Sequence, residues 1–237
     1  MDKELFIENY RNAFGDYELP VVFWYSDQPV ATPEKMRGCF MGQLKSAREG
    51  KFVSLSTDEI TCPGGKVYTG FTDVPPFLPG YVSGKERYKE TPEQVISFIE
   101  DLNMTDQSGT FLNFVSLDRV DDFSSVEGVI FFATPDVLSG LVSWALFDTN
   151  KPDAVSALFG SGCSANVAQV VVENRKNGYR SFLGMFDPSV RPQVEANILT
   201  LAVPMSRFLK MSSTISESCL QGTHAWEKVK QRIEDGV

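Results

Sequence analysis

Apolar side chains recur every three or four residues in several stretches of the chain, which is the period of an amphipathic helix. Near the amino terminus, Leu5, Phe6, Tyr10 and Phe14 follow this spacing, and the turn-forming stretch "FGDYELP" ends the helix. In "TPEQVISFIEDL", a threonine N-cap followed by proline predicts a helix beginning at Thr91. Further helices are predicted within "CFMGQLKSAREGK", "ANVAQVVVE", "SRFLKMSSTISESCL" and "HAWEKVKQRIEDGV".

Shorter apolar stretches between these helices are rich in β-branched and aromatic residues, as expected of buried strands. The predicted strands lie within "PVVFWYSD", "FVSLS", "TFLNFVSL", "GVIFFA" and "SFLGMFD". Because strands and helices are mixed along the chain, we expect an α/β (or α+β) fold. The prediction is a single domain over residues 1–237, with helices packed against one mixed sheet.

Two parts of the chain, residues 20–73 and 128–187, resemble each other in their order of elements. Cys62 in "ITCPGG" corresponds to Cys163 in "GSGCSA", and each cysteine is followed by a G-x-x-D element. The spacing between cysteine and glycine differs, and α/β sequences also resemble one another by chance. If the halves are related, the two cysteine loops should converge near a pseudo-twofold axis.

The charge and the cysteine content indicate which partners and which cellular compartment to expect. Asp and Glu number 31 against 22 Lys and Arg, so nucleic acid is an unexpected partner. The longest apolar runs are shorter than the ~20 residues that span a bilayer, and no signal peptide is visible. We therefore expect a cytoplasmic protein without a membrane partner, whose four cysteines are reduced thiols.

Two of the cysteines lie among small residues that predict a binding site. Cys62 precedes Pro63, Gly64 and Gly65, whose backbone could approach an anion closely. Cys163 lies in the equally small "FGSGCSA", with Gly160 and Gly162 before it. A thiol at the start of a helix has a depressed pKa and can act as a nucleophile or a ligand. The alternative is that both thiols are small buried apolar groups.

A metal site or iron–sulfur cluster could use Cys39, Cys62 and Cys163, because thiolates select zinc, copper(I) or iron. However, no C-x-x-C pair is present, although such sites commonly contain one. The single histidine, His224, is predicted to lie at a helix start, so neither a Cys-His dyad nor a serine triad is indicated.

The stretch "GSGCSA", Gly160 to Ala165, also fits the G-x-G-x-x-A pattern of dinucleotide-binding folds, and Asp187 ends a later strand. In such a fold these residues would hold pyrophosphate and ribose. The preceding strand is only weakly hydrophobic, and the chain is short after Asp187. We therefore favour a tight strand-to-helix turn here.

A stretch dense in proline and glycine, Thr72 to Glu90, predicts a long loop. Within it, residues 74–88 carry the aromatic side chains Phe77, Tyr81 and Tyr88. We expect this segment to cover the cysteine site as a lid. The basic residues Lys85, Arg87 and Lys89 would favour an anionic ligand.

The segment Gly38 to Phe71, with "FGSGCSANV" and "SCLQGTHAWEKVKQRI", resembles the uncharacterised ArCR (archaeal conserved region) family, a domain of unknown function. The shared features fall on Cys39, on Cys62 with the two glycines after Pro63, and on Cys163. The resemblance spans nearly the whole chain and implies a single domain. It implies no activity and no catalytic residue.

These observations predict a protein that binds a small anionic ligand or a metal-containing cofactor. The ligand-binding residues would be Cys62, Gly64, Gly65, Gly160, Gly162 and Cys163. Two alternatives stay open. The chain could be a thiol-dependent enzyme or redox protein, or a protein interaction module with structural cysteines. The pattern leaves the oligomeric state open.

Overall fold

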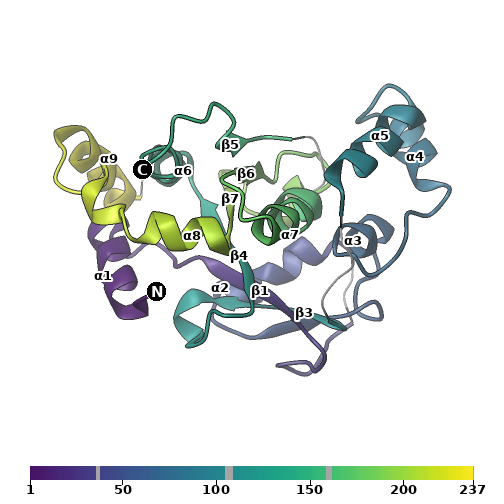
Figure 1. Cartoon of the computed structure of the whole chain (residues 1–237), viewed down its shortest axis with the longest axis horizontal. Helices are drawn as coiled ribbons and strands as arrows, with labels where there is room; N and C mark the ends of the chain where they lie inside the picture. The colour runs from purple at the N-terminus through teal and green to yellow at the C-terminus, as the bar shows by residue number, and fades with distance from the viewer. Residues whose placement is uncertain (36–37, 105–108, 159–161, 237) are drawn as a thin grey trace.

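The computed structural model of the chain describes residues 1–35, 38–104, 109–158 and 162–236 (Figure 1). In chain order, the α-helices are α1 (Lys3–Phe14), α2 (Leu44–Arg48), α3 (Pro63–Tyr68), α4 (Leu78–Tyr81), α5 (Pro92–Leu102), α6 (Pro135–Ala145), α7 (Gln169–Arg175), α8 (Met205–Ser212) and α9 (His224–Asp235). The strands are β1 (Val21–Ser26), β2 (Val53–Leu55), β3 (Phe111–Ser116), β4 (Val126–Ala133), β5 (Val155–Ser156), β6 (Ser181–Gly184) and β7 (Leu199–Pro204).

Short helical turns of other types join these elements. The 3-10 turns are η1 (Phe40–Gln43), η3 (Leu117–Arg119), η5 (Arg191–Gln193) and η6 (Ile215–Glu217), and the π-helical turns are η2 (Val82–Glu86) and η4 (Ser164–Ala168). The two π-helical turns stand out because this geometry is rare and often occurs at functional sites.

The strands form one seven-stranded sheet in the order β2-β3-β1-β4-β7-β6-β5. Neighbouring strands are antiparallel except β5 and β6, which are parallel. The predicted mixed sheet with helices packed against it is therefore confirmed. The pattern analysis did not identify β7, although this strand is hydrogen-bonded to both β4 and β6 near the centre of the sheet.

Each face of the sheet has its own hydrophobic core, because side chains alternate along a strand. On β1, Val21 and Phe23 belong to the core beneath η1, α2, η4 and α7, whereas Val22 belongs to the opposite core. The second core contains side chains of α1, α6, α8 and α9. Two indole N–H groups join these helices: Trp144 donates to the Met211 carbonyl and Trp226 donates to the Ala13 carbonyl.

Figure 1 shows α4 and α5 at the end of the molecule away from α1 and α9. The predicted helix at Thr91 is present as α5, and the Thr91 side chain accepts a hydrogen bond from the Gln94 backbone N–H. The long loop predicted over Thr72 to Glu90 is wrong in its centre, because α4 and η2 lie there. Pro79 stands in the first turn of α4, where its missing N–H costs nothing.

The relation between residues 20–73 and 128–187 stays a prediction. Their first strands, β1 and β4, are adjacent and antiparallel at the centre of the sheet. The helices that follow these strands, α2 and α6, pack in the cores on opposite faces.

Helix α7 approaches the sheet closely because β4 carries glycine at the point of contact. A Cβ atom at Gly128 would lie 2.2 Å from Val170 Cγ1, 3.0 Å from Phe23 and 3.0 Å from the Val203 carbonyl oxygen. Any larger residue would push α7, and with it the preceding turn η4, away from the sheet.

We predict that Gly128→Ala lowers the free energy of unfolding by about 2 kcal/mol, because overpacking a rigid core forces backbone shifts. Chemical denaturation would measure this effect. The matched control is Gly80→Ala in α4, where an added Cβ meets no atom within 4 Å, and we expect it to be neutral or slightly stabilising. Equal stabilities of the two variants would contradict this account of the helix position.

Candidate functional site

A cavity of about 430 Å³ lies where five separate segments of the chain meet. We call it the cysteine cavity, because Cys39, Cys62 and Cys163 all border it. Its other lining residues are Pro63, Gly64, Gly65, Tyr68, Phe77, Leu78, Tyr81, Val82, Glu86, Tyr88, Gly162, Ser189 and Val190. The structure thus brings together five of the six predicted ligand-binding residues, and the sixth, Gly160, lies outside the described residues.

Cys62 is the residue before α3, and Pro63 opens that helix with its fixed backbone angle. The Thr61 hydroxyl donates to the Gly38 carbonyl over 3.4 Å, which joins the backbone beside Cys62 to the backbone beside Cys39. This contact explains how two thiols separated in the sequence border one cavity.

Gly64 and Gly65 differ in how closely other atoms approach them. Neither glycine has a positive φ. Gly65 permits close packing, because its Cβ would lie 3.1 Å from Ile60 Cγ2 and 3.3 Å from Phe40 Cδ1. At Gly64 the nearest atom would be Cys62 Sγ at 4.0 Å, so alanine would fit there.

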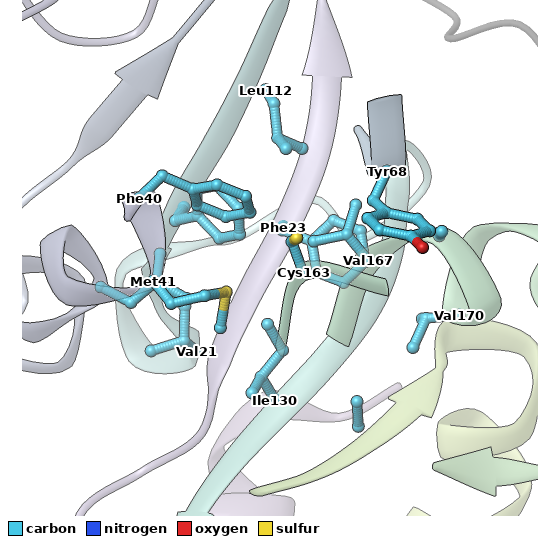
Figure 2. Close-up of a cluster of buried hydrophobic side chains, with 14 of the residues drawn as sticks. Val21, Phe23, Phe40, Met41, Tyr68, Leu112, Ile130, Cys163, Val167 and Val170 are labelled. Carbon is cyan, nitrogen blue, oxygen red and sulfur yellow. The ribbon is translucent and has the colours of Figure 1, made fainter. Parts of the chain in front are cut away.

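Cys163 lies just before the π-helical turn η4 and is only 3% exposed. Figure 2 shows its sulfur within the hydrophobic cluster that contains Phe23, Val167 and Tyr68. Gly162 allows this position, because a Cβ there would lie 2.8 Å from Val190 Cγ2. Cys163 is therefore both a core residue and part of the cavity wall. The sequence analysis treated these two positions, buried apolar group and binding-site residue, as alternatives.

The electrostatic surroundings keep some of the lining groups protonated. Burial, together with the neighbouring Cys62 and Asp187, raises the pKa of Cys39 to about 11, despite an opposing hydrogen bond to the Met41 backbone. Burial and the Asp187 carboxylate also raise the pKa of Glu86. Burial raises the pKa of Tyr68 well above its ordinary value, with smaller contributions from Cys163 and Glu86. At neutral pH, Cys39 is consequently a thiol and not a thiolate.

The metal site predicted at Cys39, Cys62 and Cys163 gains no support from the arrangement of side chains. Within the ranges that the structure describes, no group of three His, Cys, Asp or Glu residues is placed to hold a metal ion. A metal or iron–sulfur cofactor therefore stays a prediction from sequence. Cys219 is exposed and His224, the first residue of α9, is also exposed; neither borders the cavity.

Segment 74–88 borders the cavity through α4 and η2. Phe77 is 58% exposed and Tyr81 is 48% exposed, so both aromatic side chains lie at the rim. The backbone leaves η2 at Arg87, which has φ of 59°, a left-handed conformation uncommon for a residue other than glycine. Lys85, Arg87 and Lys89 are not among the lining residues.

Three lining residues outside segment 74–88 had no role in the sequence interpretation: Tyr68, Ser189 and Val190. No sequence pattern marks Ser189 and Val190 as cavity residues. They reach the cavity only because η4 packs against the end of β6.

We predict slow alkylation of Cys39 by iodoacetamide at pH 7, with a rate that rises about tenfold per pH unit up to about pH 11. Mass spectrometry of the labelled peptides would measure the rate. The exposed Cys219 is the internal control and should be modified faster at pH 7. Modification of Cys39 at neutral pH as fast as that of Cys219 would contradict the raised pKa.

Comparison with known proteins places the chain in a family. Neither a curated protein nor a solved structure has a significant match to it. No helix in the described part of the chain combines the length and the apolar character needed to cross a membrane. A family model described as uncharacterised ArCR, a domain of unknown function (DUF169), matches residues 17–214. The chain therefore belongs to the uncharacterised ArCR family, which confirms the resemblance found in its sequence.

Proposed function

We propose that this protein binds a small, largely apolar organic molecule in the cysteine cavity. The observation that carries this proposal is the convergence of five segments, from Cys39 to Val190, on one cavity of about 430 Å³. That volume lies within the range of small-molecule sites, which are typically apolar with a few placed polar groups. Packing alone does not require a space of this size, since protein interiors are usually filled.

The polar groups around the cavity indicate the charge of the ligand. The described lining contains one carboxyl group, Glu86, and no lysine or arginine side chain. The hydroxyl groups of Tyr68, Tyr88 and Ser189 add neutral donors and acceptors. This composition supports a neutral molecule more than the anion expected from Lys85, Arg87 and Lys89. An anionic ligand stays as an alternative that the anionic dye in the experiment below can detect. A metal-containing cofactor stays as a further alternative, which metal analysis of the purified protein would detect.

The rim of the cavity supports a lid function for residues 74–88. Phe77 and Tyr81 expose about half of their surface although both border the cavity. A bound apolar molecule would bury these rings, which is favourable by roughly 25 cal/mol per Å² of apolar surface removed from water. The π-helical turn η2 and the left-handed Arg87 give the segment two places where its backbone departs from regular helix geometry.

A second candidate function is thiol chemistry inside the cavity, and the three sulfur atoms in its wall favour it. Cys39 is protonated at neutral pH and is a poor nucleophile. Cys62 is partly exposed at the start of α3, so it is the thiol that would react with a bound electrophile. The third reading, a protein interaction module, would use the exposed Phe77 and Tyr81 rings as the contact surface.

We predict that the neutral fluorophore N-phenyl-1-naphthylamine binds the wild-type chain, and that Phe77→Ala with Tyr81→Ala weakens this binding about tenfold. Fluorescence titration would measure both affinities. Phe147→Ala is the matched control, because Phe147 is 46% exposed and does not border the cavity. Titration with the anionic dye 8-anilinonaphthalene-1-sulfonate tests the alternative that the cavity binds an anionic ligand. If neither dye binds, or if the control weakens binding equally, the cavity is not the site.

We further predict that hydrogen exchange of residues 74–88 slows when N-phenyl-1-naphthylamine binds, because the rim segment is then held against the ligand. Mass spectrometry of exchanged peptides would measure this, with α9 (His224–Asp235) as the internal reference. Binding that leaves exchange in residues 74–88 unchanged would show that this segment is a fixed wall and not a lid.

A further inference from the structure

A second cavity, of about 400 Å³, lies beside the cysteine cavity, and three parts of the chain border both spaces. Tyr88 lines both cavities. The backbone passes from one to the other between Pro188, in the wall of the second cavity, and Ser189, in the wall of the cysteine cavity. It does so again between Ala165 and Cys163. The two cavities are therefore neighbours that share a wall.

The Tyr88 side chain holds this shared wall in place. Its hydroxyl accepts a hydrogen bond from the Ser189 backbone N–H over 3.1 Å, which joins segment 74–88 to the segment after β6. The Tyr88 backbone N–H donates to the Val82 carbonyl over 3.1 Å, so the residue is also tied to η2. Tyr88 is only partly buried, and the open part of its ring is available to a ligand that extends from one cavity into the other.

Exposed apolar side chains line both cavities. Phe77 and Tyr81 expose about half of their surface at the rim of the cysteine cavity. Leu158 and Phe186, in the wall of the second cavity, are 42% and 52% exposed. Tyr88, which borders both cavities, lies between these two groups. Exposed apolar side chains that gather around concave surface are typical of ligand-binding grooves.

Polar groups are distributed unequally between the two cavities. The lining of the cysteine cavity includes Tyr68 and Glu86, which carry a hydroxyl and a carboxyl group. Within the described lining of the second cavity, Asp187 is the one charged residue, and it is only 6% exposed. Its Oδ1 accepts hydrogen bonds from the Val190 N–H and the Ser189 hydroxyl, and its Oδ2 is buried. A ligand with one polar end would therefore place that end in the cysteine cavity and its apolar part in the second cavity.

We propose that the two cavities together bind one neutral long-chain lipid, such as a fatty alcohol. The hydroxyl head group lies in the cysteine cavity near Tyr68 and Glu86. The alkyl tail passes along the Tyr88 ring into the second cavity, where it contacts Leu158 and Phe186. Neither described lining contains a lysine or arginine side chain, and the protein is acidic overall, so a neutral head group fits better than a carboxylate. This inference rests on the proposed function and extends it, because it names the class of ligand.

Octan-1-ol, decan-1-ol and dodecan-1-ol, titrated into the full chain by isothermal calorimetry, test this proposal. Because each buried methylene contributes a similar free energy, the affinity should rise about fourfold per added methylene throughout the series. The double variant Leu158→Ser with Phe186→Ser should leave octan-1-ol binding unchanged and weaken dodecan-1-ol binding about tenfold. Leu146→Ser with Phe147→Ser is the matched control, because these side chains are 40% and 46% exposed and border neither cavity.

Leu158→Ser alone is a second variant, which leaves the residue next to the left-handed Met185 unchanged, and it should weaken dodecan-1-ol binding about threefold. The proposal is overturned if dodecan-1-ol binds wild type no more tightly than octan-1-ol. It is also overturned if the control pair weakens dodecan-1-ol binding as much as the double variant, with both shown to be folded by circular dichroism.

The dye titration separates failure of this inference from failure of the proposed function. If N-phenyl-1-naphthylamine binding depends on Phe77 and Tyr81, the proposed function stands even when the alkanol series shows no gain with length. If the dye does not bind, the proposed function fails and this inference fails with it. A dimer in size-exclusion chromatography that only the double variant dissociates, without alkanol binding, would overturn the proposal and assign the exposed side chains to contact between two copies.

Discussion

The packing of η4 and α7 against the centre of the sheet is the constraint on which the wall of the cysteine cavity depends. Gly128 lets Val170 come close to β4, and Gly162 lets the start of the turn pack beside Val190. Together these contacts fix the turn from both of its ends. Cys163, the residue before the turn, then borders the cysteine cavity, and Ala165 within the turn borders a second cavity of about 400 Å³ at the end of β6. A shift of this turn would change both spaces at once.

This arrangement also explains why the thiols are chemically unequal. Cys163 is enclosed by Phe23 and Val167 in the core, whereas Cys39 and Cys62 lie on short segments joined by the hydrogen bond from Thr61 to Gly38. Burial leaves Cys39 protonated, so its sulfur atom acts first as part of an apolar surface. The proposed role of the cavity as a binding site therefore does not require that any thiol react.

Much of the fold follows from local sequence patterns. The β-branched and aromatic residues of β1 and β4 predict buried strands, and Thr91 with Pro92 predicts the start of α5. The convergence of Cys62 and Cys163 on one cavity was predicted from their similar small-residue surroundings. That these residues bind a ligand stays a proposal.

Other features depend on contacts between distant residues, and no local sequence pattern predicts them. Residues 78–86 form helical turns although proline and glycine predict a loop, because the backbone bonds of α4 and η2 satisfy one another. The need for glycine at positions 65 and 128 comes in part from Phe40 and Val170, which are distant in sequence and which the local pattern does not place nearby.

A crystal structure of the chain soaked with N-phenyl-1-naphthylamine would test the central claim most directly. The account predicts electron density for the dye between Cys62, Tyr68 and Phe77, with the Tyr81 ring moved onto it. Density for the dye only at other surfaces, with Phe77 and Tyr81 folded into the cavity and filling it, would contradict the assignment of this space as a binding site.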